Sequence, residues 1–158
     1  MTVSLWRIAA DTPDWTADDM AGKGAAAKGG RWNVPGEHVT YASTSISLAA
    51  WETRAHLGRL AARLPFNRIL VRIEVPDDVW AKRESLPGPL PVGWNVIPEG
   101  KTSRTIGSAW LARATSALLC VPSVIVEEED NVLINPAHPD AARLGVTRVR
   151  RFLYDSRV

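Results

Sequence analysis

Cysteine is almost absent from this sequence, and long apolar runs are missing. Cys120 is the only cysteine in 158 residues, so the chain cannot form an internal disulfide. It lies in the apolar run 118–121, which is typical of a buried thiol in a reducing compartment. No apolar stretch approaches the roughly 20 residues of a membrane-spanning helix, and Arg7 interrupts the only apolar opening segment. We therefore expect a soluble, cytoplasmic protein without a membrane partner.

An excess of charge of one sign is also lacking. The sequence has 19 Lys and Arg against 17 Asp and Glu, a net charge of +2, which is too small for a protein that coats a phosphate backbone. The densest basic cluster, Arg148, Arg150 and Arg151, follows a strand pattern that divides its side chains between two faces. We expect a solvated strand there and no direct nucleic-acid partner.

Several motifs of metal and nucleotide chemistry are missing. His38, His56 and His138 stand alone, without a second His or Cys at the spacing of metal ligands. No serine lies in a Gly-x-Ser-x-Gly turn, which disfavours a serine hydrolase. The glycines at 22–24 and 29–30 do not follow a clear strand, so they form neither a phosphate loop nor a dinucleotide fingerprint. We expect no metal and no resident cofactor.

The chain has the length and apolar content of one folded domain. With 158 residues, 46% of them hydrophobic, and no internal repeat or linker, it is expected to form a single domain over residues 1–158. Tryptophan dominates the aromatic residues, with seven Trp against two Phe and two Tyr. Most of these rings should lie in the core or in the walls of a groove, because each combines a wide apolar surface with one N–H group.

Hydrophobic periodicity and turn residues predict an α+β fold with mostly antiparallel strands. The expected elements are a strand over 3–8, a loop or irregular helix over 11–30, a strand over 39–42, a helix from the capping hydroxyls of 43–45 to about residue 60, a strand over 67–75, a loop over 76–100, a helix over 103–114, strands over 118–121, 124–126 and 132–134, and a strand over 146–153. The first helix is expected to bury a stripe formed by Leu48, Trp51, Ala55 and Leu57. The second places Ile106 and Trp110 on one face.

Four residues form a candidate site for cleavage of the nicotinamide–ribose bond of NAD. Arg31 follows two glycines, and its guanidinium can form paired hydrogen bonds with phosphate oxygens. Tyr41 offers a ring for stacking and a polar hydroxyl. Glu52 lies in a helical segment that can hold a carboxylate beside the ribose, where positive charge develops as nicotinamide leaves. Ser123 interrupts a strand pattern after Pro122 and can either bond the carboxamide or orient Glu52.

Each of these residues also has a plainer interpretation. Glu52 can be an exposed helical residue that pairs with Arg54 or His56. Arg31 can be a solvated loop arginine, and Tyr41 a core residue of a strand. The hydroxyl of Ser123 can simply cap a bulge. The residue types alone do not choose between these interpretations.

Further segments extend this pattern over nearly the whole chain. They are L-W-R-I at 5–8, G-R-W-N at 30–33, Y-A-S at 41–43, the helical segment 49–57, I-G-S-A-W-L at 106–111, V-P-S at 121–123 and N-P-A-H-P at 135–139. With these segments the chain resembles the RES-domain toxins of bacterial toxin–antitoxin pairs, a family named for Arg, Glu and Ser. The naming residues correspond to Arg31, Glu52 and Ser123, and Tyr41 stands where the family has an aromatic site residue.

The resemblance implies a fold similar to that of ADP-ribosyltransferase toxins, with NAD as the substrate. It also implies growth arrest unless a cognate antitoxin, usually Xre-like, blocks the cleft. The acceptor of the ADP-ribosyl group stays open between water, phosphate and a target protein. In this interpretation Arg31 grips the pyrophosphate, Tyr41 stacks, Glu52 stabilises the cationic ribose and Ser123 organises the nicotinamide end.

Two other classes of function remain as alternatives. A non-catalytic nucleotide- or RNA-binding module would use Trp32, Tyr41 and the arginines for stacking and phosphate contacts. An interaction domain would use its tryptophan-rich surface only to dock a partner. The enzyme hypothesis makes a geometric demand that the others do not, since Arg31 and Glu52 must face one shared hollow.

Overall fold

The computed structural model describes residues 1–58 and 63–158, which form a single α+β domain. Its described strands form one sheet in the order β4-β5-β6-β2-β1-β3-β7. The strands are β1 (Thr2–Ala10), β2 (Thr40–Ser43), β3 (Arg68–Pro76), β4 (Glu84–Ser85), β5 (Leu118–Pro122), β6 (Asp130–Ile134) and β7 (Gly145–Arg151). The helices are α1 (Lys23–Lys28), α2 (Ile46–Leu57), α3 (Asp77–Ala81), α4 (Lys101–Arg113) and the 3-10 helix η1 (Pro139–Arg143).

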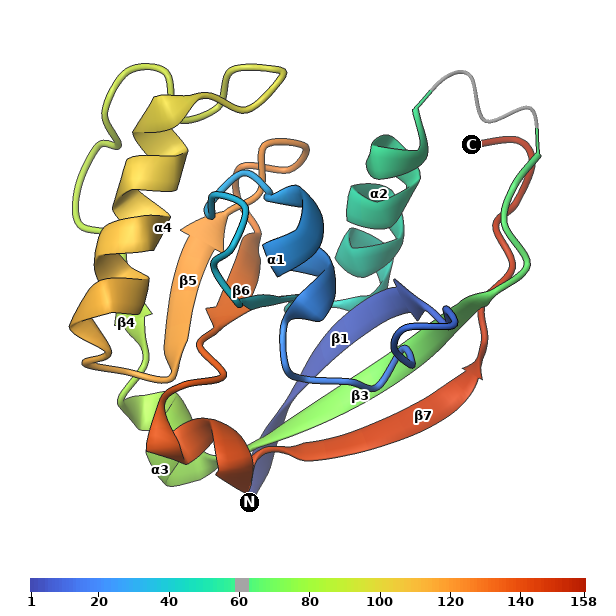
Figure 1. Ribbon diagram of the computed structural model, residues 1–158, viewed down its shortest axis with the longest axis horizontal. Coiled ribbons are helices and arrows are strands. Elements are labelled where there is room, and N and C mark those ends of the chain that lie inside the picture. The colour runs from blue at the N-terminus through green and yellow to red at the C-terminus, as the bar shows by residue number, and fades with distance from the viewer. Residues whose placement is uncertain (59–62) are drawn as a thin grey trace.

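The sheet is antiparallel except where the short strand β4 lies parallel to β5. β3 pairs with β1 along its whole length, from Pro76 opposite Thr2 to Arg68 opposite Ala10. β2, by contrast, meets β1 only where Trp6 lies opposite Ser43. The sheet therefore opens between β1 and β2, and its two halves, β4-β5-β6-β2 and β1-β3-β7, diverge from that point (Figure 1).

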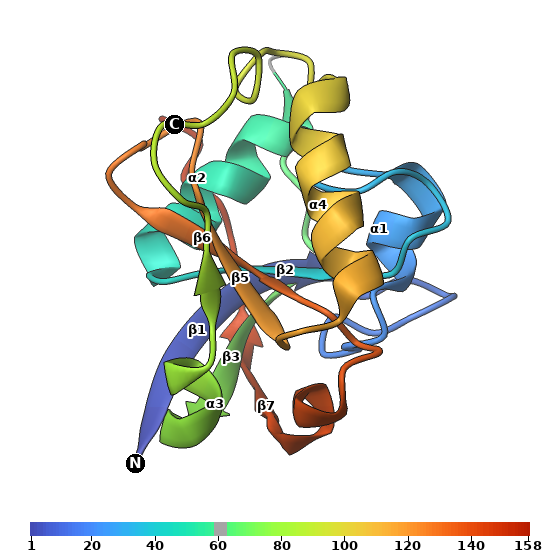
Figure 2. The same ribbon diagram turned by 90° about the vertical axis from the view of Figure 1, so that its left-hand side faces the viewer.

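Helices cover this opened sheet from one side. Figure 1 shows α1 between α4 and α2, and the view turned by 90° in Figure 2 shows the same three helices on one side, with α3 and η1 at the opposite end. Trp110 of α4 is fully buried against Leu119 and Leu133 of the first half. α2 contributes Ala49 to a smaller cluster with Ile8 and Leu70 of the second half. Each half of the sheet thus has its own helix.

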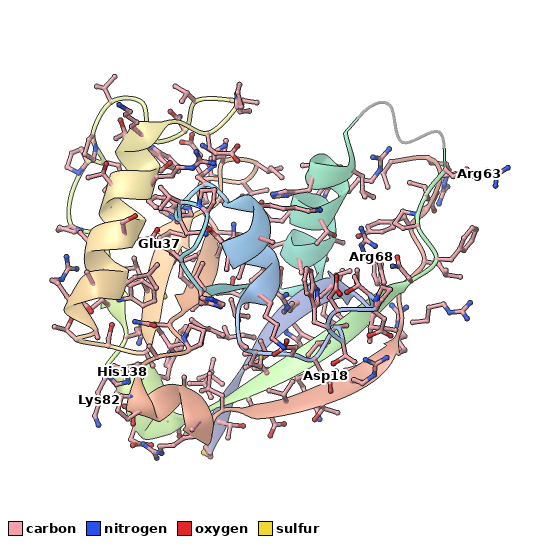
Figure 3. The ribbon with its side chains drawn as sticks, in the orientation of Figure 1. Asp18, Glu37, Arg63, Arg68, Lys82 and His138 are labelled. Carbon is pink, nitrogen blue, oxygen red and sulfur yellow. The ribbon has the colours of Figure 1, made fainter. Side chains whose placement is uncertain are left out.

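One glycine sets how closely α4 approaches the first half of the sheet. A Cβ atom on Gly107 would lie 1.7 Å from the carbonyl oxygen of Trp32. Glu37, labelled in Figure 3, fixes the same loop to α4 because its Oε1 accepts hydrogen bonds from Ser108 Oγ at 2.8 Å and from Val34 N at 2.8 Å. The loop that contains Arg31 is therefore held against α4 by direct backbone contact.

Most of the expected elements are present, and the overall α+β class is confirmed. The loop or irregular helix over 11–30 contains the short α1, and the segment 76–100 contains only the short α3 and β4. The N-cap of α2 is Ser45, whose Oγ accepts a hydrogen bond from Leu48 N. The expected end of α2 near residue 60 lies outside the described residues.

The expected buried stripe of α2 is wrong in part. Leu48 is buried as expected, but Trp51 is 49% exposed and Ala55 is exposed, while Ala49 is buried. The inward face of α2 continues with the half-buried polar residues Glu52 and Thr53. The apolar pattern misled because this face borders an open cavity, lined by Glu52, Thr53 and Ala55 of α2, instead of a dry core.

The expected strand over 124–126 is also wrong. These residues form a bend, and the backbone N–H groups of Ile125 and Val126 donate to Ser123 Oγ at 3.0 and 3.1 Å instead of to a neighbouring strand. A side-chain oxygen therefore replaces the partner strand. The hairpin that joins β5 to β6 is present, with Leu119 opposite Leu133.

Two expectations about single features are confirmed. Cys120 is a buried core thiol, and burial raises its pKa. Arg148 lies on the exposed strand β7 and forms ion pairs with Asp11 and Asp18.

No helix in the described part of the chain has the length and apolar character needed to cross a bilayer.

Candidate functional site

A cavity of about 590 Å³ lies where the sheet opens. Residues of β1 and β2 line it from the two sides of the opening. α1, α2, the loop around Arg31, the segment 97–99 and the hairpin between β5 and β6 also contribute to its walls. Trp6, Trp15 and Trp32 contribute rings to these walls. Arg31 and Glu52 both line this cavity. The enzyme hypothesis requires these two residues to face one shared hollow, and the cavity is such a hollow.

The carboxylate of Glu52 is held through one of its two oxygens. Oε1 accepts a hydrogen bond from Ser123 Oγ at 2.6 Å and another from Asn131 Nδ2 at 2.7 Å. Among the described residues, neither of these donors engages Oε2, which leaves that oxygen for a ligand in the cavity.

Ser123 acts on the cavity only through Glu52. Its side chain is fully buried, and Ser123 is not one of the residues that line the cavity. Because its Oγ accepts from the N–H groups of Ile125 and Val126, its single proton is directed to Glu52. Of the two roles considered for Ser123, this geometry provides the orientation of Glu52, and it offers no direct contact to a carboxamide.

Asn131 completes this arrangement, although no pattern in the sequence marks it as a site residue. Its Oδ1 accepts a hydrogen bond from Ser43 Oγ at 2.7 Å, which fixes the amide so that Nδ2 points to Glu52. Asn131 and Ser43 lie opposite each other in the pairing of β6 with β2. An asparagine at the end of a predicted turn gives no signal in the sequence, because only strand pairing brings it to Glu52.

Arg31 is fixed by the loop that follows α3 and β4. Its Nη1 donates to the carbonyl oxygens of Trp94 at 3.1 Å and of Val96 at 2.9 Å. Trp94 also stacks on Trp32, with ring centroids 6.2 Å apart. These contacts hold the guanidinium at the cavity wall through one of its nitrogens, and its other N–H groups keep their capacity to bind an anion.

The ring of Tyr41 lines the cavity, while the hydroxyl of Tyr41 is engaged in hydrogen bonds within the protein. The hydroxyl donates to Asn33 Oδ1 at 2.7 Å and accepts from Trp32 N at 3.1 Å. Burial raises the pKa of Tyr41, so the side chain stays a neutral phenol. Tyr41 therefore lines the cavity with its hydroxyl proton already committed to Asn33.

Arg7 is a second arginine of the cavity, and it does not belong to the four residues of the predicted site. Its Nη1 donates to Tyr41 O at 3.0 Å across the opening between β1 and β2. Its Nε is buried and has no hydrogen-bond partner among the described residues. Burial lowers the pKa of Arg7, partly offset by the charge of Asp19. The sequence signal was an arginine inside an apolar strand.

Charges of both signs therefore meet in one cavity of moderate size. Arg7, Lys28 and Arg31 supply cations to its walls, and Glu52 and Glu99 supply carboxylates. The described residues contain no group of three or more His, Cys, Asp or Glu side chains that could hold a metal ion. The fold and the site together define a class: a single α+β domain with an opened sheet, whose cavity combines aromatic rings, arginines and one anchored glutamate.

Comparison with known proteins identifies the family within this class. The model of the RES domain matches residues 4–155. A protein named "Prs ADP-ribosylating toxin" from Sphingobium sp. (strain YBL2) is 52% identical over 159 residues, covering 100% of this chain and 98% of that protein. A "Toxin Res" of Pseudomonas putida is 38% identical over 154 residues, covering 98% of both chains. A "Toxin Res" of Yersinia enterocolitica is 36% identical over 124 residues, or 78% of this chain and 79% of that protein.

The chain therefore belongs to the RES-domain family, and the relatives it matches are named as toxins. The resemblance inferred from the sequence segments is confirmed at the level of this family.

Proposed function

We propose that this protein is a toxin that transfers the ADP-ribosyl group of NAD⁺ to an acceptor. Its membership of the RES-domain family supports this proposal, as does the name of the relative from Sphingobium, which describes an ADP-ribosylating toxin. The observation that supports it most directly is the pair of hydrogen bonds from Ser123 and Asn131 to Glu52 Oε1. They fix a carboxylate in a cavity that also holds two arginines.

A fixed carboxylate suits the chemistry of nicotinamide loss. As the bond between ribose C1′ and nicotinamide breaks, the ribose acquires positive charge and nicotinamide leaves as a neutral molecule. A carboxylate that is already oriented stabilises this charge without reorganising during the reaction. In this proposal Oε2 of Glu52 faces the ribose, while Ser123 and Asn131 keep Oε1 in place.

The arginines and rings suit the rest of the dinucleotide. Arg31 can form paired hydrogen bonds with pyrophosphate oxygens, and the buried charge of Arg7 gains a partner when an anion enters the cavity. The ring of Tyr41 provides a surface for stacking on the nicotinamide or the ribose. Anchoring the pyrophosphate would fix the ribose beside Glu52.

The acceptor and the partner complete the proposal. The name of the Sphingobium relative favours a protein acceptor over water or phosphate. We further propose growth arrest in the cytoplasm unless a cognate antitoxin, of the Xre-like kind, covers the cavity. NAD⁺ is a consumed substrate in this scheme, and no resident cofactor is needed.

Incubation of the purified protein with NAD⁺ labelled in its adenylate phosphate tests the proposal. We expect release of nicotinamide, with transfer of the label to a protein band when cell extract is present. Glu52→Gln should lower the rate of nicotinamide release by about 100-fold or more, because it removes the charge that stabilises the transition state. The control is Glu128→Gln, which makes the same substitution at an exposed position away from the cavity.

Each outcome of this experiment has a separate meaning. Label that appears only in free ADP-ribose or ADP-ribose phosphate assigns water or phosphate as the acceptor. NAD⁺ that binds but is not cleaved by the wild-type protein contradicts the enzyme and supports the nucleotide-binding alternative. Equal nicotinamide release by wild type and Glu52→Gln removes Glu52 from the mechanism.

A further inference from the structure

We propose that His56 is the general base that takes the proton from the acceptor nucleophile, through its Nε2 atom. This inference rests on the proposed function and concerns the second half of the reaction, in which the acceptor attacks ribose C1′. His56 lies on α2 one helical turn after Glu52, and both residues line the cavity. Residues four apart on a helix are neighbours on one face.

The contact made by Nδ1 assigns the tautomer of the neutral ring. His56 Nδ1 lies 2.8 Å from the backbone carbonyl oxygen of Glu52. A carbonyl oxygen can only accept a hydrogen bond, so the proton of the ring is on Nδ1. Nε2 then carries the basic lone pair of the ring and can accept a proton. A histidine oriented in this way through its other nitrogen is the usual arrangement of a general base.

The other two histidines, both within the described residues, lack one part of this arrangement. His38 has the same kind of contact, with Nδ1 3.0 Å from the carbonyl oxygen of Ala21, but it does not line the cavity. His138 Nδ1 accepts a hydrogen bond from Asp140 N, so in the neutral ring its proton is on Nε2. Figure 3 shows His138 near α3, at the end of the molecule away from α2.

Glu52 is poorly suited to take this proton itself. Its Oε1 already accepts two hydrogen bonds, and its charge is needed on the ribose side until the new bond has formed. Protonation of Glu52 during the attack would remove that charge. The side chain of His56 is exposed, so it can pass a proton on to water.

The step balances without a further reactant. The bond between C1′ and the nicotinamide nitrogen breaks, and its electron pair leaves with neutral nicotinamide. The acceptor oxygen forms a bond to C1′, and the proton of its O–H group moves to Nε2 of His56. The resulting imidazolium releases this proton to solvent, and no atom is oxidised or reduced.

His56→Asn in the otherwise intact protein tests the assignment, because the amide nitrogen of Asn can replace Nδ1 as a donor to Glu52 O but provides no basic lone pair. With NAD⁺ and water as the acceptor, we expect the rate of ADP-ribose formation to fall by about 100-fold. Added sodium azide should restore turnover and give ADP-ribosyl azide, because azide is an anion and needs no deprotonation. Glu52→Gln should not be restored by azide.

His38→Asn is the matched control, since it removes a histidine with the same backbone contact outside the cavity, and it should keep the wild-type rate with both acceptors. His56→Asn with an unchanged rate in water contradicts the inference. An equal loss with water and with azide also contradicts it, because His56 would then act in binding or in nicotinamide release. Wild-type protein that releases no nicotinamide contradicts the proposed function, and the inference with it.

Discussion

At the scale of single residues, the hydrogen bonds to Glu52 decide which atom of the carboxylate can meet a ligand. Ser123 and Asn131 both donate to Oε1, and each is itself fixed by a second contact. This arrangement divides the candidate residues into two groups. Glu52, Arg31 and Tyr41 line the cavity, whereas Ser123 supports Glu52 from within the protein.

Asn131→Leu should slow NAD⁺ cleavage while leaving substrate binding nearly unchanged. The substitution removes one donor from Oε1 and frees Glu52 to leave its orientation, which we expect to lower kcat by about 10- to 100-fold. KM for NAD⁺ should change little, because Asn131 does not bind the pyrophosphate in the proposed mode. Steady-state kinetics of nicotinamide release would measure both constants. Asn67→Leu, at an exposed position outside the cavity, provides the control. A large rise in KM with unchanged kcat for Asn131→Leu would be evidence against a positioning role of Asn131.

Arg7→Met should separate stability from ligand binding. The buried Nε of Arg7 has no hydrogen-bond partner among the described residues, which is costly, so an apolar side chain of similar length should leave the free energy of unfolding unchanged or raise it by about 1 kcal/mol. NAD⁺ binding should weaken, because a cation of the cavity is lost. Urea unfolding and a direct binding titration would measure the two quantities. Arg7→Lys retains the charge as a control, and undiminished NAD⁺ binding by Arg7→Met would exclude Arg7 as an anion contact.

At the scale of secondary-structure elements, the close approach of α4 to the loop around Arg31 depends on Gly107, which has no side chain. The Trp32 carbonyl oxygen occupies the position that a Cβ atom on Gly107 would need. Trp32 also packs with Trp110 and Leu133 in the core beneath α4. The same close packing therefore places Arg31 at the cavity wall and anchors α4 on the sheet.

Gly107→Ala should accordingly destabilise the protein despite the higher helix propensity of alanine. The new methyl group would displace α4 or the loop, and we expect a loss of about 3 kcal/mol in the free energy of unfolding. The midpoint of urea or thermal unfolding would report it. Thr105→Ala, an exposed substitution on the same helix, should stay close to wild type. A Gly107→Ala variant with wild-type stability would show that this close approach is not needed for folding.

At the scale of the whole molecule, a long-range ion pair connects the end of the chain to its beginning. Arg148 of β7 donates to Asp11 Oδ1 and Oδ2 at 2.8 and 2.7 Å, and these bonds help to hold the loop after β1 against the edge strand. The hydrogen bonds from Arg148, together with that from Ala17 N, lower the pKa of Asp11 from 3.8 to about 2. The carboxylate is therefore favoured in the folded state relative to the unfolded chain.

This shift predicts a loss of stability in acid. Because the folded-state pKa lies below the unfolded one, the contribution of Asp11 is fully present above pH 3.8 and is lost as the pH falls through about 2. Asp11→Asn should reduce this part of the pH dependence and leave the other acidic groups to act as before. Urea unfolding at neutral pH, at pH 4 and at pH 2 would measure it. Asp14→Asn, which forms no ion pair with the described residues, should retain the wild-type dependence.

Much of the fold and part of the site could be predicted because the evidence for them is local. The alternation in β3, the capping hydroxyl of Ser45 and the break at Pro122 are each visible within a few residues. The three naming residues Arg31, Glu52 and Ser123 belong to short segments that the family resemblance marks. The errors in α2 and at 124–126 arose where a local pattern was overruled. Ala55 of α2 faces an open cavity instead of a core, and the hydroxyl of Ser123 takes the place of a partner strand at 124–126.

The sequence by itself determined the α+β class, the family, and the residue types from which a site for a charged ligand can be built. Only the tertiary structure decided that Asn131 reaches Glu52, that Ser123 stays beneath the cavity surface, and that Arg7 and His56 line the same cavity. The physical reason is that these relations depend on strand pairing and on the opening between β1 and β2. Both involve residues that are far apart in the chain, and no local pattern records which of them will meet.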